Sequence, residues 1–310
     1  MTEQISALRL GASLYVPATR SDLAAIANGH RHPFLKSVIL CTEDSILAEQ
    51  VDAALVNLAD CLTQLLEDAR PLVFIRPRTI EVLGRILAMK GIERIDGFVL
   101  PKTTPDSMIA CATLVPPRFL LMPTLETLDV FDATALRDLR TVLSGPGLKD
   151  RILALRIGGN DILNLLGIRR RAGKTIYDTA AGPVMAALVA AFRPFGFALT
   201  APVFEDFGDL ATLREEVSRD LDHGLVGKAA IHPFQVGQIE RQYRVAEEDL
   251  EIANRVLAVD APAVFQVDQI MCEPATHCQW ARATVDRARI YGVEGKADSL
   301  TTLDRRLVAS

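Results

Sequence analysis

The stretch Arg151-Ile-Leu-Ala-Leu-Arg-Ile-Gly-Gly-Asn-Asp161 contains the pattern on which the whole chain is built. Its apolar run from 152 to 157 indicates a buried strand. Two glycines follow, and glycine lets backbone N–H groups approach a ligand closely. Asn160 and Asp161 come next, before an apolar segment that indicates a helix. A strand that ends in such residues is typical of a ligand site, although Gly-Gly-Asn-Asp is equally typical of an ordinary turn.

Seven other segments repeat this pattern of a short apolar run followed by polar residues. The eight predicted strands are Leu10–Val16, Val38–Cys41, Leu72–Ile75, Gly97–Leu100, Phe119–Met122, Ile152–Ile157, Phe195–Thr200 and Lys228–Ile231. Amphipathic segments separate most of them, and the one from Leu47 to Leu66 keeps its apolar residues on one helical face. Alternating strands and helices favour a parallel sheet, and continuous apolar runs indicate strands that are buried on both faces.

Eight such units predict an α/β fold, a closed (β/α)8 TIM barrel, over residues 1–245. An open doubly wound sheet is the alternative, but that fold favours a Gly-x-Gly-x-x-Gly turn after an early strand, and Gly158-Gly159 comes too late. Residues 246–310 are expected to form a C-terminal helical extension, with one helix over Glu247–Val259 and another that runs through Trp280 to Ile290. This extension packs on its own barrel or on a neighbouring subunit.

The composition excludes several classes of function. With 49% apolar and 24% charged residues the chain is typical of globular proteins, and its net charge of −5 gives no reason to expect nucleic acid or an anionic membrane as a partner. Neither a signal peptide nor an apolar run long enough to span a bilayer is evident. The five cysteines form no Cys-x-x-Cys pair, so we expect reduced thiols in a cytoplasmic protein.

In a TIM barrel, chemistry takes place at the C-terminal ends of the strands. Charged or titratable residues follow nearly every predicted strand: Arg20, Glu43, Asp44, Arg76, Lys102, Glu126, Asp161, Glu205, Asp206 and His232. Any one of them is consistent with a solvated loop, but their presence at nearly every end favours a functional site.

Glu126 and Asp161 follow adjacent strands and suit a hard divalent cation, because Mg²⁺ is usually bound by one or two carboxylates. No His/Cys cluster of the zinc type is present. Arg20 and Arg76 can bind a substrate carboxylate through their planar guanidinium groups. Further substrate contacts are expected from backbone N–H groups after the sixth strand, those of Gly158, Gly159 and Asn160. A 2-keto acid chelated to Mg²⁺ fits this set, since the metal stabilises the enolate formed in aldol or Claisen cleavage.

A Schiff-base lysine is the other common mechanism of barrel aldolases. Lys102 ends the fourth strand, and Lys228 begins the eighth. The carboxylate pair favours the metal route.

The strand-end motifs resemble the citrate lyase β-subunit-like family of the HpcH/HpaI aldolase group. The matching segments are Leu14-Tyr-Val-Pro-Ala-Thr-Arg20, Val38-Ile-Leu-Cys-Thr-Glu43-Asp44, Phe74-Ile-Arg76-Pro-Arg78, Asp96-Gly-Phe-Val-Leu-Pro-Lys102, Glu126-Thr127, Gly158-Gly-Asn-Asp-Ile162 and Gly227-Lys-Ala-Ala-Ile-His-Pro-Phe-Gln235. The resemblance implies a magnesium-dependent lyase or hydrolase that acts on acyl-CoA thioesters such as citryl-, malyl- or citramalyl-CoA. It assigns Glu126 and Asp161 to the metal and Arg76 to the substrate. It also implies a homotrimer, in which Glu273 of Met271-Cys-Glu273-Pro274 enters the neighbouring site as an acid.

The chain departs from the family pattern at three places. The aspartate that precedes Leu-Glu-Asp is replaced around Cys41-Thr42, the asparagine of Val-Arg-x-Asn is Arg78, and the aspartate after strand seven is Ala201 or Pro202. These changes resemble a divergent branch, the C–C bond lyases of the TIM-barrel fold. A carbon–carbon lyase is therefore the leading hypothesis, with Glu43 and Asp44 orienting Arg76 or metal-bound water. The alternatives are an acyl-CoA thioesterase on the same scaffold and a non-catalytic metabolite-binding barrel, which Arg78 would favour if it crowded the pocket.

Overall fold

A computed structural model describes residues 5–68, 70–267 and 269–294. The chain divides into two compact units, 1–242 and 243–310.

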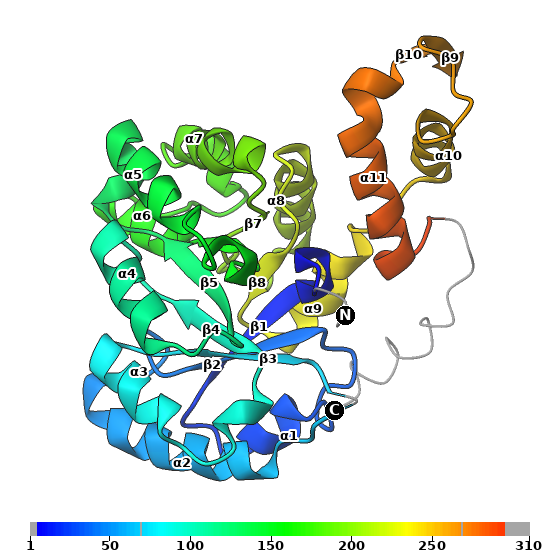
Figure 1. Ribbon diagram of the computed structural model, residues 1–310. Helices are drawn as coiled ribbons and strands as arrows, with labels where there is room; N and C mark the ends of the chain where they lie inside the picture. The colour runs from blue at the N-terminus through cyan, green and yellow to red at the C-terminus, as the bar shows by residue number, and fades with distance from the viewer. Residues whose placement is uncertain (1–4, 69, 268, 295–310) are drawn as a thin grey trace. The chain divides into compact units, whose positions relative to one another are not determined.

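The first unit is a barrel of eight parallel strands (Figure 1). The strands are β1 (Ala12–Pro17), β2 (Ser37–Cys41), β3 (Leu72–Arg76), β4 (Gly97–Leu100), β5 (Leu120–Leu125), β6 (Leu155–Ile157), β7 (Leu199–Thr200) and β8 (Lys228–Ala230). Each strand from β1 to β6 pairs with the next, and β8 pairs with β1. The seam between β7 and β8 is joined by backbone hydrogen bonds, in which Val226 N–H donates to Leu199 O and Ala229 N–H donates to Ala201 O. The predicted (β/α)8 barrel is confirmed.

Helices connect the strands and cover the outside of the barrel (Figure 1). They are α1 (Leu23–Ala27), α2 (Val51–Gln64), α3 (Ile80–Leu87), α4 (Pro105–Leu114), α5 (Ala133–Leu143), α6 (Gly159–Leu165), α7 (Gly182–Phe192), α8 (Leu210–Asp222) and α9 (Pro233–Arg241). Short 3-10 helices occupy Ala7–Leu10, Ala48–Gln50, Ile92–Arg94, Leu128–Phe131, Lys149–Arg151, Ile176–Asp178 and Arg193–Phe195. Helix α3 shows how the sequence sets such an element: the Thr79 hydroxyl caps its first turn by accepting from Val82 N–H, and Leu83 and Ile86 bury one face.

Two strands are shorter than the apolar runs that predicted them. The run from Phe195 to Thr200 contributes only its last two residues to β7, because Phe195 lies in a 3-10 turn and Gly196 follows with a φ of +85°. Strand β6 begins at Leu155, although Ile152 already makes an isolated bridge to Leu121. An apolar run therefore fixes neither strand backbone nor burial at every position, since Phe195 is 47% exposed.

The second unit contains a helical pair and a small hairpin. Helices α10 (Glu247–Val256) and α11 (Pro274–Tyr291) flank the antiparallel strands β9 (Phe265–Val267) and β10 (Ile270–Cys272). Its core contains Ile252, Ala253, Val256, Val267, Cys272 and Ala281. Both predicted helices are present, but the extension is not all helical. Within the described ranges, neither unit has a helix of the length and apolar character that a membrane span requires.

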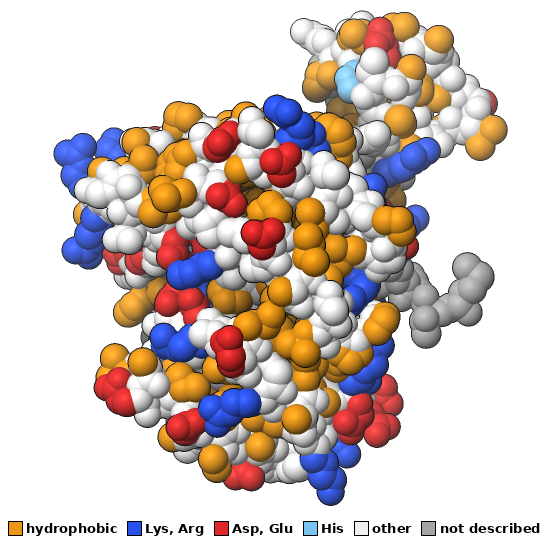
Figure 2. Space-filling model, turned by 60° about the vertical axis from the view of Figure 1, so that its left-hand side comes forward, with side chains coloured by type: hydrophobic (Ala, Val, Ile, Leu, Met, Phe, Trp, Pro, Cys, Tyr) orange, Lys and Arg blue, Asp and Glu red, His pale blue; other side chains and the backbone are white. Residues whose placement is uncertain are grey.

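The surface carries charges of both signs. On the face that Figure 2 shows, Lys and Arg side chains are interspersed with Asp and Glu. This distribution agrees with the small net charge of −5.

Candidate active site

A cavity of about 260 Å³ opens at the C-terminal ends of the barrel strands. It brings together most of the residues that the sequence pointed to: Asp44, Arg76, Glu126, Gly158, Gly159, Asn160 and Asp161. Four further polar residues line it that sequence reasoning missed, Tyr15, Ser45, Thr124 and Arg156. The cavity lies where the barrel architecture places catalytic groups.

Glu126 follows β5 and is almost completely buried, with 4% of its surface exposed. Its Oε1 accepts a hydrogen bond of 2.7 Å from the backbone N–H of Lys102. Burial raises the pKa of the Glu126 carboxyl to about 7, against the effect of that hydrogen bond, and Asp161 raises the pKa further. Lys102 adopts a left-handed φ of +47°, which is uncommon outside glycine and occurs here at the rim of the site.

An ion-pair network surrounds the cavity. Glu43 is buried and accepts from Arg76 Nη2 at 2.8 Å. The Nζ of Lys102 lies 3.3 Å from Glu43 Oε1, 3.7 Å from Asp44 Oδ2 and 3.1 Å from Asp161 Oδ1. Arg76 Nε also contacts Cys41 Sγ at 3.2 Å. Glu43 therefore forms ion pairs with both Arg76 and Lys102.

Gly158 provides space for Glu126. A Cβ atom at position 158 would lie only 2.0 Å from Glu126 Oε2, so any larger residue would displace the carboxylate. The N–H of Gly158 is not available to a ligand, because it donates to Leu125 O. The expected backbone donors are thus the N–H groups of the first turn of α6, at Gly159, Asn160 and Asp161, which have no partner within a helix.

The donor set fits a magnesium ion. Glu126 and Asp161 face one cavity, and the buried carboxyl of Glu126 lacks a side-chain cation within ion-pair distance among the described residues. A cation would supply that charge, and water and substrate oxygens would complete an octahedral shell. In the described ranges no group of three or more His, Cys, Asp or Glu residues is placed to hold a metal, so water and substrate oxygens would have to supply most of the shell.

The two lysines of the alternative mechanism are poorly suited to form a Schiff base. Burial alone would lower the pKa of Lys102, but Glu43 and Asp161 outweigh burial and raise that pKa. Lys228 is fully buried, with its Nζ 2.8 Å from Glu216 Oε1 and 2.9 Å from Asp220 Oδ2. An amine that is held as an ammonium by carboxylates is a weak nucleophile.

Three residues that the sequence highlighted lie elsewhere. Arg20 does not line the cavity, because both arms of its guanidinium bind Asp22, with Nε 2.7 Å from Oδ1. Arg78 does not crowd the cavity, because its Nη2 donates to the backbone oxygens of Glu43 and Ile46. Glu273 belongs to the second unit, where it precedes α11 and accepts from the Thr276 hydroxyl at 3.1 Å.

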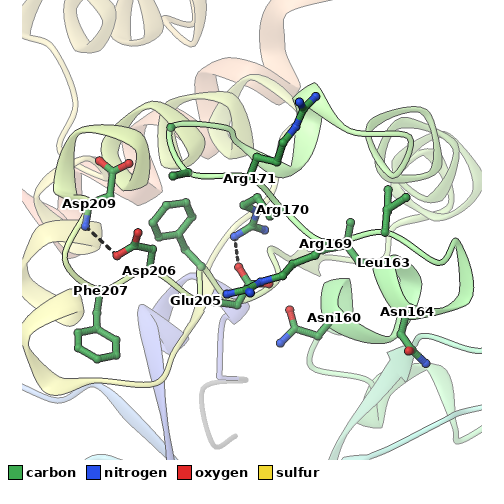
Figure 3. A pocket seen from close by; sticks show the side chains of 14 residues that line it. Asn160, Leu163, Asn164, Arg169, Arg170, Arg171, Glu205, Asp206, Phe207 and Asp209 are labelled. Atoms are coloured by element: carbon green, nitrogen blue, oxygen red, sulfur yellow. Dashed lines mark hydrogen bonds and ion pairs between the residues drawn. The ribbon is translucent and has the colours of Figure 1, made fainter.

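A second pocket, of about 870 Å³, shares Asn160 with the first. Figure 3 shows Arg169 reaching across it toward Glu205, while Arg171 points away. Arg170 is nearly buried and forms an ion pair with Glu205, and Phe204 and Phe207 add apolar surface. Glu205 and Asp206, which the sequence placed at the seventh strand end, therefore belong to this neighbouring pocket.

The sequence matches the family of C–C bond lyases of the TIM-barrel fold over residues 4–293. This chain belongs to that family. No curated protein sequence matches it. The chain therefore has the family's activity class, carbon–carbon lyase, as the strand-end motifs predicted.

Solved structures with the same fold include proteins from Mycobacterium tuberculosis and Yersinia pestis. Protein CitE from Mycobacterium tuberculosis, in complex with magnesium, acetoacetate and coenzyme A, is 23% identical over 91% of this chain and 99% of its own, with a TM-score of 0.68. RipC from Yersinia pestis is 20% identical, covers 76% of this chain and 96% of its own, and has a TM-score of 0.58. The citrate lyase beta subunit from M. tuberculosis, complexed with oxaloacetate and magnesium, is 23% identical over 76% of this chain and 99% of its own, with a TM-score of 0.58.

Proposed function

We propose that this lyase is magnesium-dependent and that it cleaves a C–C bond in a hydroxyacyl-CoA or a related hydroxy or keto acid. The observation that carries the proposal is the convergence of Glu126, Asp161 and Arg76 on one cavity at the strand ends. Magnesium in the complexes of the CitE and citrate lyase beta subunit structures supports the choice of metal.

The residues of the chain take complementary roles in this proposal. Glu126 and Asp161 hold the metal, which when bound supplies a Lewis acid beside the reacting carbonyl. Arg76 binds the carboxylate of the keto-acid fragment, and its ion pair with Glu43 fixes the direction of its guanidinium. The first-turn N–H groups of α6 donate to the same anion.

The larger pocket offers room for the rest of the substrate. It meets the metal site at Asn160, so a substrate chelated between Glu126 and Asp161 can extend into it. Arg169 is exposed there and suits an anionic group, and the coenzyme A bound in the CitE complex supports a thioester substrate.

Further elements of the proposal concern assembly and location. A homotrimer would let Glu273 act as an acid in the site of a neighbouring subunit. The five cysteines are free, which supports a reducing, cytoplasmic environment.

Calorimetric titration of Mg²⁺ in the presence of oxaloacetate or pyruvate tests the metal site. We expect the wild type to bind and Asp161→Ala to lose at least about 100-fold in metal affinity, since even substitutions around the ligands cost 10- to 100-fold. Arg20→Ala is the matched control, because Arg20 is charged and near the rim but does not line the cavity. Absence of binding in the wild type would overturn the proposal.

Product analysis tests the reaction. Cleavage of a hydroxyacyl-CoA into a keto acid and a shorter acyl-CoA agrees with the proposal. Release of free CoA with the hydroxy acid intact would instead identify a thioesterase.

A further inference from the structure

Beneath the metal site, the barrel interior contains a layer of polar side chains. Thr124, Arg156 and Thr200 are register partners on β5, β6 and β7, so their side chains lie on the same face of the sheet. Arg156 Nε donates to the Tyr15 hydroxyl at 3.2 Å, and its Nη1 lies 3.4 Å from Ser13 Oγ. Since β1 and β6 are not neighbours, these contacts cross the interior of the barrel.

Arg156 is buried without a compensating charge. Only 2% of its surface is exposed, and within the described residues no carboxylate lies within ion-pair distance of its guanidinium. Its Nη2 has no hydrogen-bond partner in that part of the chain, and neither do the hydroxyls of Thr124 and Thr200. Buried charges are normally paired, and buried polar atoms are normally hydrogen-bonded. Three unpartnered atoms in one layer therefore indicate a ligand group.

The position of this layer indicates which ligand. Arg156 and Thr124 line the same 260 Å³ cavity as Glu126, Asp161 and Arg76. The guanidinium carbons of Arg76 and Arg156 lie 5.0 and 5.3 Å from the centre of the Tyr15 ring, so the two cations are at most about 10 Å apart. Arg76 is already paired with Glu43, whereas Arg156 has only neutral partners.

Building on the proposed function, we propose that Arg156, with the Thr124 hydroxyl, binds a second carboxylate of the metal-chelated fragment, which is therefore a dicarboxylic 2-keto acid. Arg76 binds the carboxylate next to the keto group, and Arg156 selects for the distal one. Arg156 is thus a specificity-determining residue. A monocarboxylic keto acid would leave the buried guanidinium unpaired, and sites with unpaired polar groups reject such analogues strongly.

The test compares oxaloacetate with 2-oxobutyrate, which carries a methyl group where oxaloacetate carries its second carboxylate. Calorimetry of the full-length protein with saturating Mg²⁺ should show oxaloacetate binding about 10- to 100-fold more tightly, the range for a hydrogen-bonded charged group. Arg156→Met should remove this preference, because oxaloacetate loses its cationic partner and 2-oxobutyrate, which no longer leaves a buried guanidinium unpaired, binds at least as tightly as it does to the wild type. Thr124→Val, which keeps the shape and charge of the site, should reduce the preference by a smaller factor.

The possible outcomes separate this inference from the proposed function. Equal affinity of the wild type for the two keto acids, both lost in Asp161→Ala, would overturn the role of Arg156 and leave the metal site intact. A full preference for oxaloacetate in both Arg156→Met and Thr124→Val would also overturn it. If neither acid binds the wild type with Mg²⁺, both proposals fail. Should Arg156→Met not fold, Thr124→Val alone decides, and an unchanged preference in it contradicts the inference.

Discussion

The barrel contains two clusters in which cationic side chains lie beside carboxylates. The clusters differ in whether side chains alone neutralise the carboxylates. At the strand ends, Glu126 and Asp161 face a cavity. At the start of β8, Lys228 pairs with Glu216 and Asp220 of α8, and all three residues are at most 2% exposed. The first cluster leaves carboxylate oxygens open to a ligand, whereas the second is satisfied by its own members. Carboxylates that line a cavity, rather than the number of charges, therefore distinguish a candidate site from a structural network.

The enclosed cluster is extended by a tyrosine and an arginine. The Tyr177 hydroxyl donates to Asp220 Oδ1 at 2.7 Å, and Arg170 Nη2 lies 3.4 Å from Glu216 Oε2. Burial alone would lower the pKa of Lys228, but Asp220 and Glu216 outweigh it and raise the pKa. Lys228 therefore stays charged, and its charge compensates the carboxylates.

The largest effect is expected for Lys228→Met, which removes the cation from the enclosed cluster. Asp220 would lose the cation it is paired with and Glu216 would keep, as a cationic partner, only the longer contact to Arg170, so the free energy of unfolding should fall by about 3–5 kcal/mol. Urea unfolding measures this change. Lys36→Met is the matched control, because Lys36 pairs with Glu240 at 2.7 Å but is about one-third exposed. A loss in Lys228→Met that is no larger than the roughly 1 kcal/mol expected for the control would contradict the distinction between the clusters.

A smaller effect is expected for Gly158→Ala, which acts on the open cluster. The new Cβ would displace Glu126, so Mg²⁺ affinity should fall about 10- to 100-fold, the range seen when ligand orientation is disturbed. Calorimetry measures the affinity, and thermal unfolding checks the fold.

Gly84→Ala provides the control for that substitution. An added Cβ at Gly84, within α3, meets nothing within 4 Å. The variant should bind Mg²⁺ as the wild type does and gain up to about 1 kcal/mol in stability, because alanine favours the helix. Unchanged Mg²⁺ binding in Gly158→Ala would mean that Glu126 is not a ligand.

The smallest effect is expected at the exposed margin of the enclosed cluster, where Asp178 Oδ1 pairs with Arg219 Nη1 at 2.6 Å. Hydrogen bonds from Arg219 and Thr175 lower the pKa of Asp178 from 3.8 to about 2. A carboxyl whose pKa is lowered by folding stabilises the folded state at every pH above its pKa in the unfolded chain. This contribution is lost as the pH falls from about 4 to about 2.

The substitution Asp178→Asn tests how much the ion pair between Asp178 and Arg219 contributes to stability. Because the pair is about one-third exposed, the variant should lose less than about 1 kcal/mol at neutral pH, or about 2 °C in melting temperature. Melting curves of both proteins should converge near pH 2. A difference that persists there would show that Asp178 acts through packing rather than charge.

Much of the candidate site was predictable because strand direction places every strand end at one rim. Glu126 and Asp161 follow β5 and β6, which are neighbours, so they face the same cavity. Arg20 follows β1 in the same way, yet Asp22, two residues later, binds its guanidinium. A strand end places a residue at the rim but does not decide its partner. Arg156 was missed because a single charge within an apolar run gives no periodic signal.

The order of apolar runs and helical segments along the chain is sufficient to predict the barrel and the polar residues at its rim. Eight apolar runs separated by helical segments permit few other packings, and each run ends in polar residues that water or a ligand must satisfy. The tertiary structure decided which of these charges meet. In the folded chain Lys228 pairs with Glu216 and Asp220, and Glu126 packs against Gly158. The Arg156 side chain lies in the barrel interior, where it donates to the Tyr15 hydroxyl. These contacts join residues far apart in the chain, and only the closed barrel brings them within hydrogen-bonding distance.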